Sequence, residues 1–180
     1  SIAKESLKIF KTLSGVLGAN PKDLKEINGI GDNNIFGLKI AQAVAGRFLA
    51  EGIINKDFIR SSDEVLKYLK YNLRDKNREV FLIIYLNGRN QILKMEEIFE
   101  GTLSTTAVYP REVVKRALDN NAAALIFVHN HPSGNPNPSS DDLTITKKLK
   151  EAAKSIDISV HDHLIIAGDE VYSFADHGIL

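Results

Sequence analysis

The sequence predicts an α/β protein, in which helices flank a layered, mixed β-sheet and a small all-helical segment precedes this domain. Two observations indicate this fold class. After the first 52 residues, segments with a helical spacing of apolar residues alternate with short β-rich runs, as in layered α/β domains. Within the first 52 residues, only helical patterns occur. We therefore expect a helical unit over residues 1–52 and an α/β domain over residues 58–180.

The N-terminal segment predicts three helices. Residues 5–18 carry apolar side chains at helical spacing. Asn20 and Pro21 suit the N-cap and the first position of a second, short helix. After a glycine turn, residues 33–51 predict a long amphipathic helix that ends at Gly52.

The α/β segment predicts three further helices. Ser61 and Glu64 have the spacing of a capping box, which indicates a helix start at this point. Residues 109–121 form a short helical pattern with Pro110 near its beginning. Residues 139–156 predict the last helix, which begins with two serines and two aspartates.

The strands are predicted between these helices. Residues 79–95 hold two β-rich runs around an Asn-Gly pair, which favours a hairpin. Residues 122–129, AAALIFVH, are a continuous apolar run that is typical of a strand buried on both faces. Residues 158–174 predict a second hairpin, which turns at a Gly-Asp pair.

Composition excludes several classes of protein. The 23 Lys and Arg residues balance the 23 Asp and Glu residues, so no net charge draws the chain to nucleic acids or membranes. The chain has no cysteine, which excludes disulfides and thiolate zinc sites. Its apolar runs are far shorter than the roughly 18 residues of a membrane span. We therefore expect a cytoplasmic protein without a membrane partner.

Two histidines with a single residue between them are the strongest candidates for chemistry. Side chains alternate in an extended chain, so His129 and His131 share one face, and Pro132 keeps His131 extended. Asp142 follows eleven residues after His131, beyond a stretch rich in Gly and Pro that can turn the chain back. Two imidazoles, one carboxylate and one open position are the usual components of a catalytic zinc site.

Each of these residues also has a structural interpretation. A His-x-His pair alone is weak evidence for a metal. Ser139 suits the N-cap of the following helix, and Asp142 then occupies its third position, where a carboxylate closes a capping box. The two interpretations of Asp142 are compatible, because a carboxylate in the first turn is already oriented for a ligand.

The spacing H-x-H-P-(x6)-S-x-x-D resembles the signature of the JAMM/MPN metalloproteases. His129, His131, Pro132, Ser139 and Asp142 match it in register. The flanking stretches EIFEGTLSTTAVYPREVV and HDHLIIAGDEVYSF are similar to the RadC branch of bacterial proteins. The resemblance covers about residues 58–180 and implies the JAMM/MPN architecture, which is related to that of the cytidine deaminases.

The resemblance also implies roles for individual residues. It implies zinc on the two histidines and Asp142, with Glu79 as the general acid and base and Ser139 as the donor to the oxyanion. The reaction is then hydrolysis of a peptide or isopeptide bond in an unidentified protein or peptide. Without the resemblance, Glu79 is a solvated residue at the start of a strand.

A second histidine cluster lies near the C-terminus. In the sequence HDH, we expect His161 and His163 on one face of a strand and Asp162 on the other. Asp162 and His163 are candidates to support the metal ligands from behind or to contact substrate, and a second metal site is an alternative. His161 fits an edge strand, and His177 fits the surface.

The N-terminal glycine turn resembles a helix-hairpin-helix. Gly29, Ile30 and Gly31 form its core, and amides at the next helix start can hold a phosphate. Asp32 and a balance of seven basic to five acidic residues through Gly52 oppose DNA binding. We expect either weak, sequence-independent DNA binding or an ordinary turn between helices.

Two functions from different classes follow. The first is a zinc-dependent metallohydrolase of the JAMM class. The second is an accessory protein of DNA repair or recombination, in which the JAMM-like domain is a scaffold and the helical segment binds DNA. A zinc deaminase needs paired cysteines, which this chain lacks.

Overall fold

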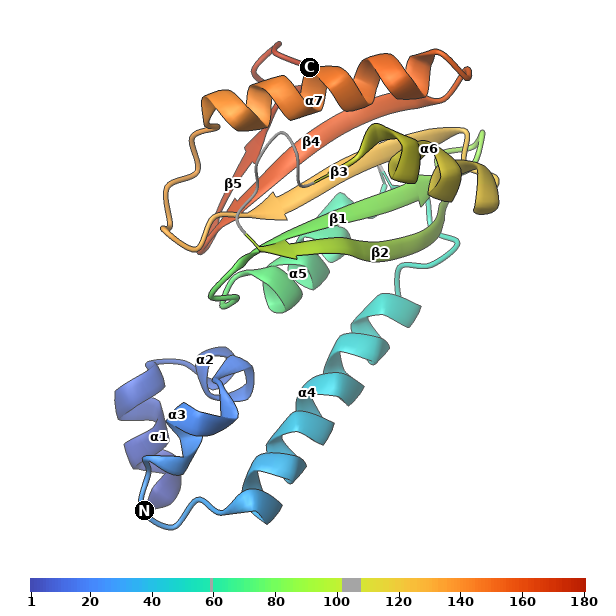
Figure 1. Cartoon of the computed structure of the whole chain (residues 1–180). Helices are drawn as coiled ribbons and strands as arrows, with labels where there is room; N and C mark the ends of the chain where they lie inside the picture. Colours follow the sequence, from blue (N-terminus) through green and yellow to red (C-terminus); the bar gives the residue numbers. More distant parts are fainter. Residues whose placement is uncertain (59, 102–107) are drawn as a thin grey trace. The chain divides into compact units, whose positions relative to one another are not determined.

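The computed structural model describes residues 1–58, 60–101 and 108–180 (Figure 1). It divides into two compact units, Ser1–Gly52 and Ile53–Leu180. In the part of the chain that it describes, no helix combines the length and the apolar character needed to cross a membrane.

The N-terminal unit contains four helices, α1 to α4. They span Ile2–Phe10, Leu13–Gly18, Pro21–Lys25 and Asp32–Glu51. Their buried side chains form a small core of Val16, Leu24, Ile27, Ile30 and Ile35.

The single helix predicted over residues 5–18 is wrong, because it is divided between α1 and α2. Lys11 has a φ of 65°, which no α-helix accommodates, and it ends α1. The Oγ1 of Thr12 then accepts a hydrogen bond from the amide of Gly15 at 2.9 Å and begins α2. Asn20 is the N-cap of α3, as predicted, and accepts from the amide of Lys22 at 2.9 Å.

The second unit is built on a five-stranded mixed sheet with the order β2-β1-β3-β4-β5. The strands span Glu79–Leu86 (β1), Ile92–Gly101 (β2), Ala124–Asn130 (β3), Ser159–Ala167 (β4) and Glu170–Ser173 (β5). β3 and β4 run parallel, and the other pairs are antiparallel. Both predicted hairpins are confirmed, and so is the α/β fold with a mixed sheet.

Helices cover both faces of this sheet (Figure 1). α5 (Ser62–Leu73) lies on one face, and α6 (Pro110–Asp119) and α7 (Ser140–Lys154) lie on the other. Alternate residues of β1 and β3 enter two separate cores, one under α5 and one under α6 and α7. β3 is buried along its whole length, because both of its faces are covered.

The capping box predicted at the start of α5 does not form. Ser61 occupies the N-cap position, but its side chain makes no capping hydrogen bond. Glu64 instead pairs with Lys56, with 2.6 Å between Oε2 and Nζ. The carboxylate that the capping box required is thus paired with a lysine that precedes the helix.

The connection from β3 through α7 to β4 positions the candidate site. β3 and β4 are parallel, so the chain must cross over the sheet, and α7 makes that crossing. The first turn of α7 consequently begins near the carboxyl end of β3, where the two histidines lie.

Candidate metal centre

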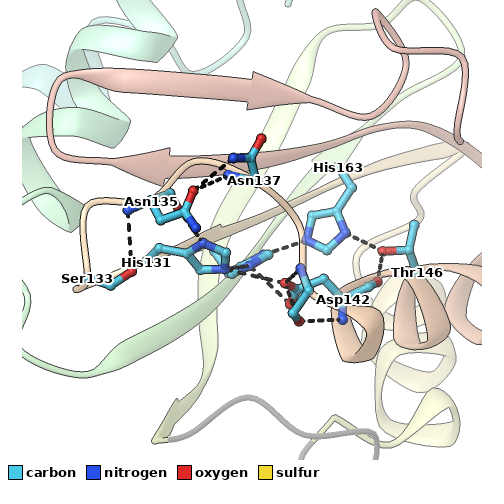
Figure 2. A network of polar contacts seen from close by, with 9 residues as sticks. His131, Ser133, Asn135, Asn137, Asp142, Thr146 and His163 are labelled. Atoms are coloured by element: carbon cyan, nitrogen blue, oxygen red, sulfur yellow. Dashed lines mark hydrogen bonds and ion pairs between the residues drawn. The ribbon is translucent and has the colours of Figure 1, made fainter.

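His129, His131 and Asp142 converge on one point. Figure 2 shows the side chains of His131 and Asp142 pointing toward each other. The Nε2 atoms of the two histidines are 2.9 Å apart. The carboxylate of Asp142 lies 3.2 Å from Nε2 of His129 through Oδ1 and 3.4 Å from Nε2 of His131 through Oδ2. The spacing of these residues in the sequence thus corresponds to a compact cluster in space.

The dimensions of this cluster suit a tetrahedral metal ion. Zinc binds imidazole nitrogen and carboxylate oxygen at about 2.0–2.2 Å, which places tetrahedral ligand atoms about 3.3 Å apart. The two imidazole nitrogens are 2.9 Å apart, and they lie 3.2 and 3.4 Å from the two different oxygens of the Asp142 carboxylate, distances close to that value. His129 and Asp142 are buried and His131 is half-buried, so one side of the cluster faces outward.

Asp142 is oriented by the first turn of α7. Ser139 is the N-cap, and its Oγ accepts from the amide of Asp142 at 3.1 Å. The amide and the hydroxyl of Ser139 both donate to Oδ2 of Asp142 at 2.7 Å. Burial disfavours the charged carboxylate, but hydrogen bonds from His129 and His131 outweigh burial and hold the pKa of Asp142 well below its usual range. The expected capping box is thus present, and it holds a carboxylate that is ionised at neutral pH.

His131 is held by the loop that follows it. Its Nδ1 lies 2.7 Å from the main-chain carbonyl of Asn135, to which it donates, and Nε2 points to Asp142 (Figure 2). Burial lowers the pKa of His131, but the hydrogen bonds to Asp142 and Asn135 exceed this effect, and the pKa is raised overall.

His129 is held from behind by His163. Its Nδ1 is 2.8 Å from Nε2 of His163, and Nδ1 of His163 is 2.5 Å from Oγ1 of Thr146 on α7 (Figure 2). Burial, followed by the neighbouring His129, lowers the pKa of His163 well below its ordinary value, so His163 is neutral. His163 therefore lies next to the metal centre, in contact with one of its ligands. Sequence analysis missed Thr146, although it follows Asp142 by one helical turn.

An irregularity in β4 places His163 on this face of the sheet. Leu125 of β3 pairs with Val160, but the next residue, Ile126, pairs with Asp162. His161 is therefore an extra residue in β4, and it interrupts the alternation that we expected for HDH. His161 is exposed and lies 2.9 Å through Nε2 from Oδ1 of Asn90.

Asp162 holds the C-terminal turn. Its Oδ1 accepts from the amides of His163 and Ala175 at 2.7 and 2.9 Å, and its Oδ2 accepts from the hydroxyl of Ser173 at 2.6 Å. Asp162 thus touches the site through the backbone of His163. His177 is exposed, as expected, and stacks on Tyr172.

Glu79 reaches the same face through the register of β1 and β3. Phe81 pairs with His129, so the antiparallel register brings Glu79, two residues earlier, opposite His131. The negative charge of Glu79 contributes to the raised pKa of His131. Glu79 is half-buried and lines a pocket of 510 Å³ with Asn77, Arg78, Gly101, Pro132 and Ser133.

Asn130 lies between the two histidines and points to the other face. Its Oδ1 accepts from the amide of Val80 at 2.7 Å, and its Nδ2 donates to the carbonyl of Arg78 at 3.1 Å. These bonds fix the backbone on both sides of Glu79. The contact of Asn130 with β1 follows from a strand pairing that the sequence does not show.

The glycine turn of the helical unit is closed largely by its own contacts. Gly29 has a φ of 92°, and an added Cβ would lie 2.8 Å from Cδ1 of Ile2. Ile30 is buried in the core of this unit. The amide of Gly31 donates to Oδ1 of Asn34 at 3.1 Å, and Asp32 pairs with Lys25 at 2.6 Å.

Comparison with known proteins identifies the family. The family model of the RadC-like JAB domain matches residues 59–179. A UPF0758 protein of Aliivibrio salmonicida is 41% identical over 177 residues, which are 98% of this chain and 79% of the relative. A UPF0758 protein of Nitrosomonas europaea is 42% identical over 179 residues, which are 99% of this chain and 80% of the relative.

These matches confirm the resemblance on which the sequence analysis relied. They include the stretch between β2 and α6, of which residues 102–107 lie outside the described part of the structure. The family match and the relatives agree over the whole α/β unit. The chain belongs to the RadC family, and its second unit is a RadC-like JAB domain.

Proposed function

We propose that the α/β unit is a zinc-dependent hydrolase of the JAMM class that cleaves peptide or isopeptide bonds. The observation that carries the proposal is the convergence of His129, His131 and Asp142 beside a pocket lined by Glu79. A JAB domain could hold such a centre without catalysis, but a pure scaffold has no need of a half-buried carboxylate opposite the ligands.

The donor set favours zinc among the common ions. Two imidazoles and one carboxylate suit zinc and similar transition metals better than magnesium or calcium, which prefer oxygen ligands alone. When bound here, zinc supplies a water of lowered pKa and polarises a substrate carbonyl.

The residues of the chain supply proton transfer, positioning of the base and binding of the substrate. Glu79 accepts the proton of the attacking water and returns it to the leaving amine. Asn130 holds the backbone around Glu79, so this carboxylate keeps its place opposite His131. The pocket of 510 Å³ in front of Glu79 receives the chain that carries the scissile amide.

Ser139 is proposed as the donor to the oxyanion, and the structure adds a condition. Its hydroxyl has one proton, which it donates to Oδ2 of Asp142 at 2.7 Å. Stabilisation of an oxyanion by Ser139 therefore requires this hydroxyl to rotate away from Asp142, while its amide still donates to the same oxygen.

Metal analysis combined with a substrate panel tests the proposal. Protein purified without chelators or metal-affinity steps should contain about one zinc per chain. It should hydrolyse at least one reporter in a panel of peptide and isopeptide amides. A chelator should abolish the cleavage, and added zinc should restore it. Stoichiometric zinc without cleavage of any reporter would favour the scaffold function.

DNA binding by the helical unit is the second candidate function. The left-handed conformation of Gly29 before the long helix α4 favours it, since such turns present amides to phosphates. The contact of the Gly31 amide with Asn34 opposes it, because this donor is already engaged.

A further inference from the structure

Thr146, His163 and His129 form a line of three buried polar groups behind the metal centre. The hydroxyl of Thr146 lies 2.5 Å from the carbonyl of Asp142 and 2.5 Å from Nδ1 of His163. Nε2 of His163 lies 2.8 Å from Nδ1 of His129. All three side chains are buried, so their polar atoms must find partners within the protein and not in solvent.

The direction of each hydrogen bond follows from counting protons. In the contact between Thr146 and the carbonyl of Asp142, only the hydroxyl has a proton to donate. The oxygen of Thr146 is then an acceptor toward His163, and Nδ1 of His163 carries the proton between them. His163 is fully buried among three aromatic rings, where a second, charge-bearing proton is costly, so Nε2 is bare and accepts from Nδ1 of His129.

This count places a proton on Nδ1 of His129 and leaves Nε2, which faces Asp142 and His131, as the nitrogen that can bind a metal. A histidine binds a metal through an unprotonated nitrogen, so this is the tautomer that the site needs. The opposite direction would place two acceptors, the carbonyl of Asp142 and Nδ1 of His163, around the single hydroxyl proton of Thr146.

The surroundings of His163 keep this line in one geometry. Its ring stacks on Phe174 with 4.8 Å between centroids. The rings of Phe81 and Phe127 lie nearly perpendicular to it, at centroid distances of 5.6 and 5.9 Å. Three aromatic neighbours fix the ring and exclude water that could replace Thr146 as its partner.

We propose that Thr146 and His163 are positioning residues that fix the tautomer of His129 and so raise the affinity of the site for its metal. The inference rests on the metal centre of the proposed function. The hydroxyl of Thr146 donates to the main-chain carbonyl of Asp142. We call the hydrogen bonds from this carbonyl through Thr146 and His163 to His129 the relay, and it joins two ligands, one on β3 and one on α7. His131 needs no such relay, because the carbonyl of Asn135 performs the same task.

Thr146→Val tests the relay, because it removes the hydroxyl and keeps the shape of the side chain. Zinc affinity, measured by competition with a chromogenic chelator, should fall about 10- to 100-fold, the usual effect of losing a group that orients a ligand. Thr146→Ser restores the hydroxyl and should recover most of this loss.

Thr144→Val is the matched control. Thr144 lies two residues earlier on α7 and donates to the carbonyl of Ser140 at 2.8 Å, the same kind of bond, but it is exposed. Its loss should leave zinc affinity unchanged. Equal affinities of the Thr146→Val and Thr144→Val variants would overturn the proposal.

A spectroscopic measurement does not depend on any variant. Nitrogen-15 NMR of metal-free, full-length protein should show the proton of His129 on Nδ1, and Thr146→Val should shift it toward a mixture of tautomers. An unprotonated Nδ1 of His129 in the unaltered protein contradicts the relay, even if Thr146→Val fails to fold. Because this readout needs no metal or substrate, it separates failure of the relay from failure of the proposed function.

Discussion

The two units of this chain bury polar side chains to very different extents. Among the described residues, six polar side chains are buried, and five of them belong to the α/β unit: His129, Asn130, Asp142, Thr146 and His163. The helical unit buries only Ser6, whose hydroxyl donates to the carbonyl of Ile2 one turn earlier. Four of the five lie in or directly behind the metal centre, and Asn130 lies between two of its ligands in the chain. Ser6, in contrast, bonds only within its own helix.

This difference indicates that the function of the chain resides in the α/β unit. Burying a polar group costs free energy unless a partner is supplied, and a stable fold gains little by gathering five of them in one place. The partners at the metal centre come from β1, β3, α7 and β4, so the three central strands and one helix are needed to satisfy them. The glycine turn of the helical unit, in contrast, encloses an apolar residue, Ile30.

The largest predicted effect removes the metal centre. His129→Ala should abolish stoichiometric zinc binding and hydrolysis together, because it deletes one of three ligands and leaves Nε2 of His163 without its donor. Zinc content by mass spectrometry and cleavage of a reporter measure the two losses.

His161→Ala is the control for this change. His161 is exposed and bonds to Asn90, so its loss should preserve both zinc and activity. Retention of stoichiometric zinc by His129→Ala would refute the proposed ligand set. Loss of zinc in His161→Ala would instead reveal a second site in the HDH sequence.

The next largest effect separates catalysis from metal binding. Glu79→Gln keeps the shape of the side chain but cannot accept a proton, so activity should fall by about 10²- to 10⁴-fold. Zinc content and thermal stability should remain close to those of the unaltered protein. Full activity with stoichiometric zinc would mean that another group is the base, and loss of zinc would make Glu79 a metal ligand.

The metal ligands are the part of the site that the sequence predicts best. His129 and His131 share a face because of strand alternation alone, and Asp142 needs only a turn and the first turn of a helix. Such local geometry depends on few residues. The position of Glu79 is different, because it follows from the register between β1 and β3, and the sequence suggested it only through the family resemblance.

The groups behind the ligands could not be predicted, for a physical reason. The extra residue in β4 decides that His163, and not Asp162, lies opposite Phe127 on the face of α7. Strict alternation cannot locate an irregularity of this kind. Local signals also fail where tertiary partners compete, as when Lys56 takes the carboxylate of Glu64 from its capping box.

A moderate effect of pH should distinguish the metal-free from the zinc-loaded protein. The pKa of His131 is raised overall, so its protonation stabilises the metal-free fold below the ordinary histidine value of 6.5, and this contribution is lost as pH rises through the raised pKa. Zinc requires the neutral ring, so its affinity should rise over the same range by up to about tenfold per pH unit.

Thermal unfolding at several pH values between 6 and 8 measures this effect. The increase in Tm that zinc causes should grow as pH rises. Asp142 does not contribute to this change, because its pKa lies well below this range. An increase that is independent of pH would mean that His131 does not bind the metal in the zinc-loaded protein.

The smallest predicted effect concerns DNA binding by the helical unit, measured by fluorescence titration of labelled duplexes at low ionic strength. We expect weak binding at Gly29 to Gly31 that ignores sequence and falls steeply with salt. Lys25→Gln should weaken it more than Lys22→Gln. Both changes remove one positive charge, but only the loss of Lys25 exposes the charge of Asp32, with which it pairs at 2.6 Å. Equal effects of the two changes would place the DNA elsewhere, and absence of binding at low salt would leave the turn with a structural role alone.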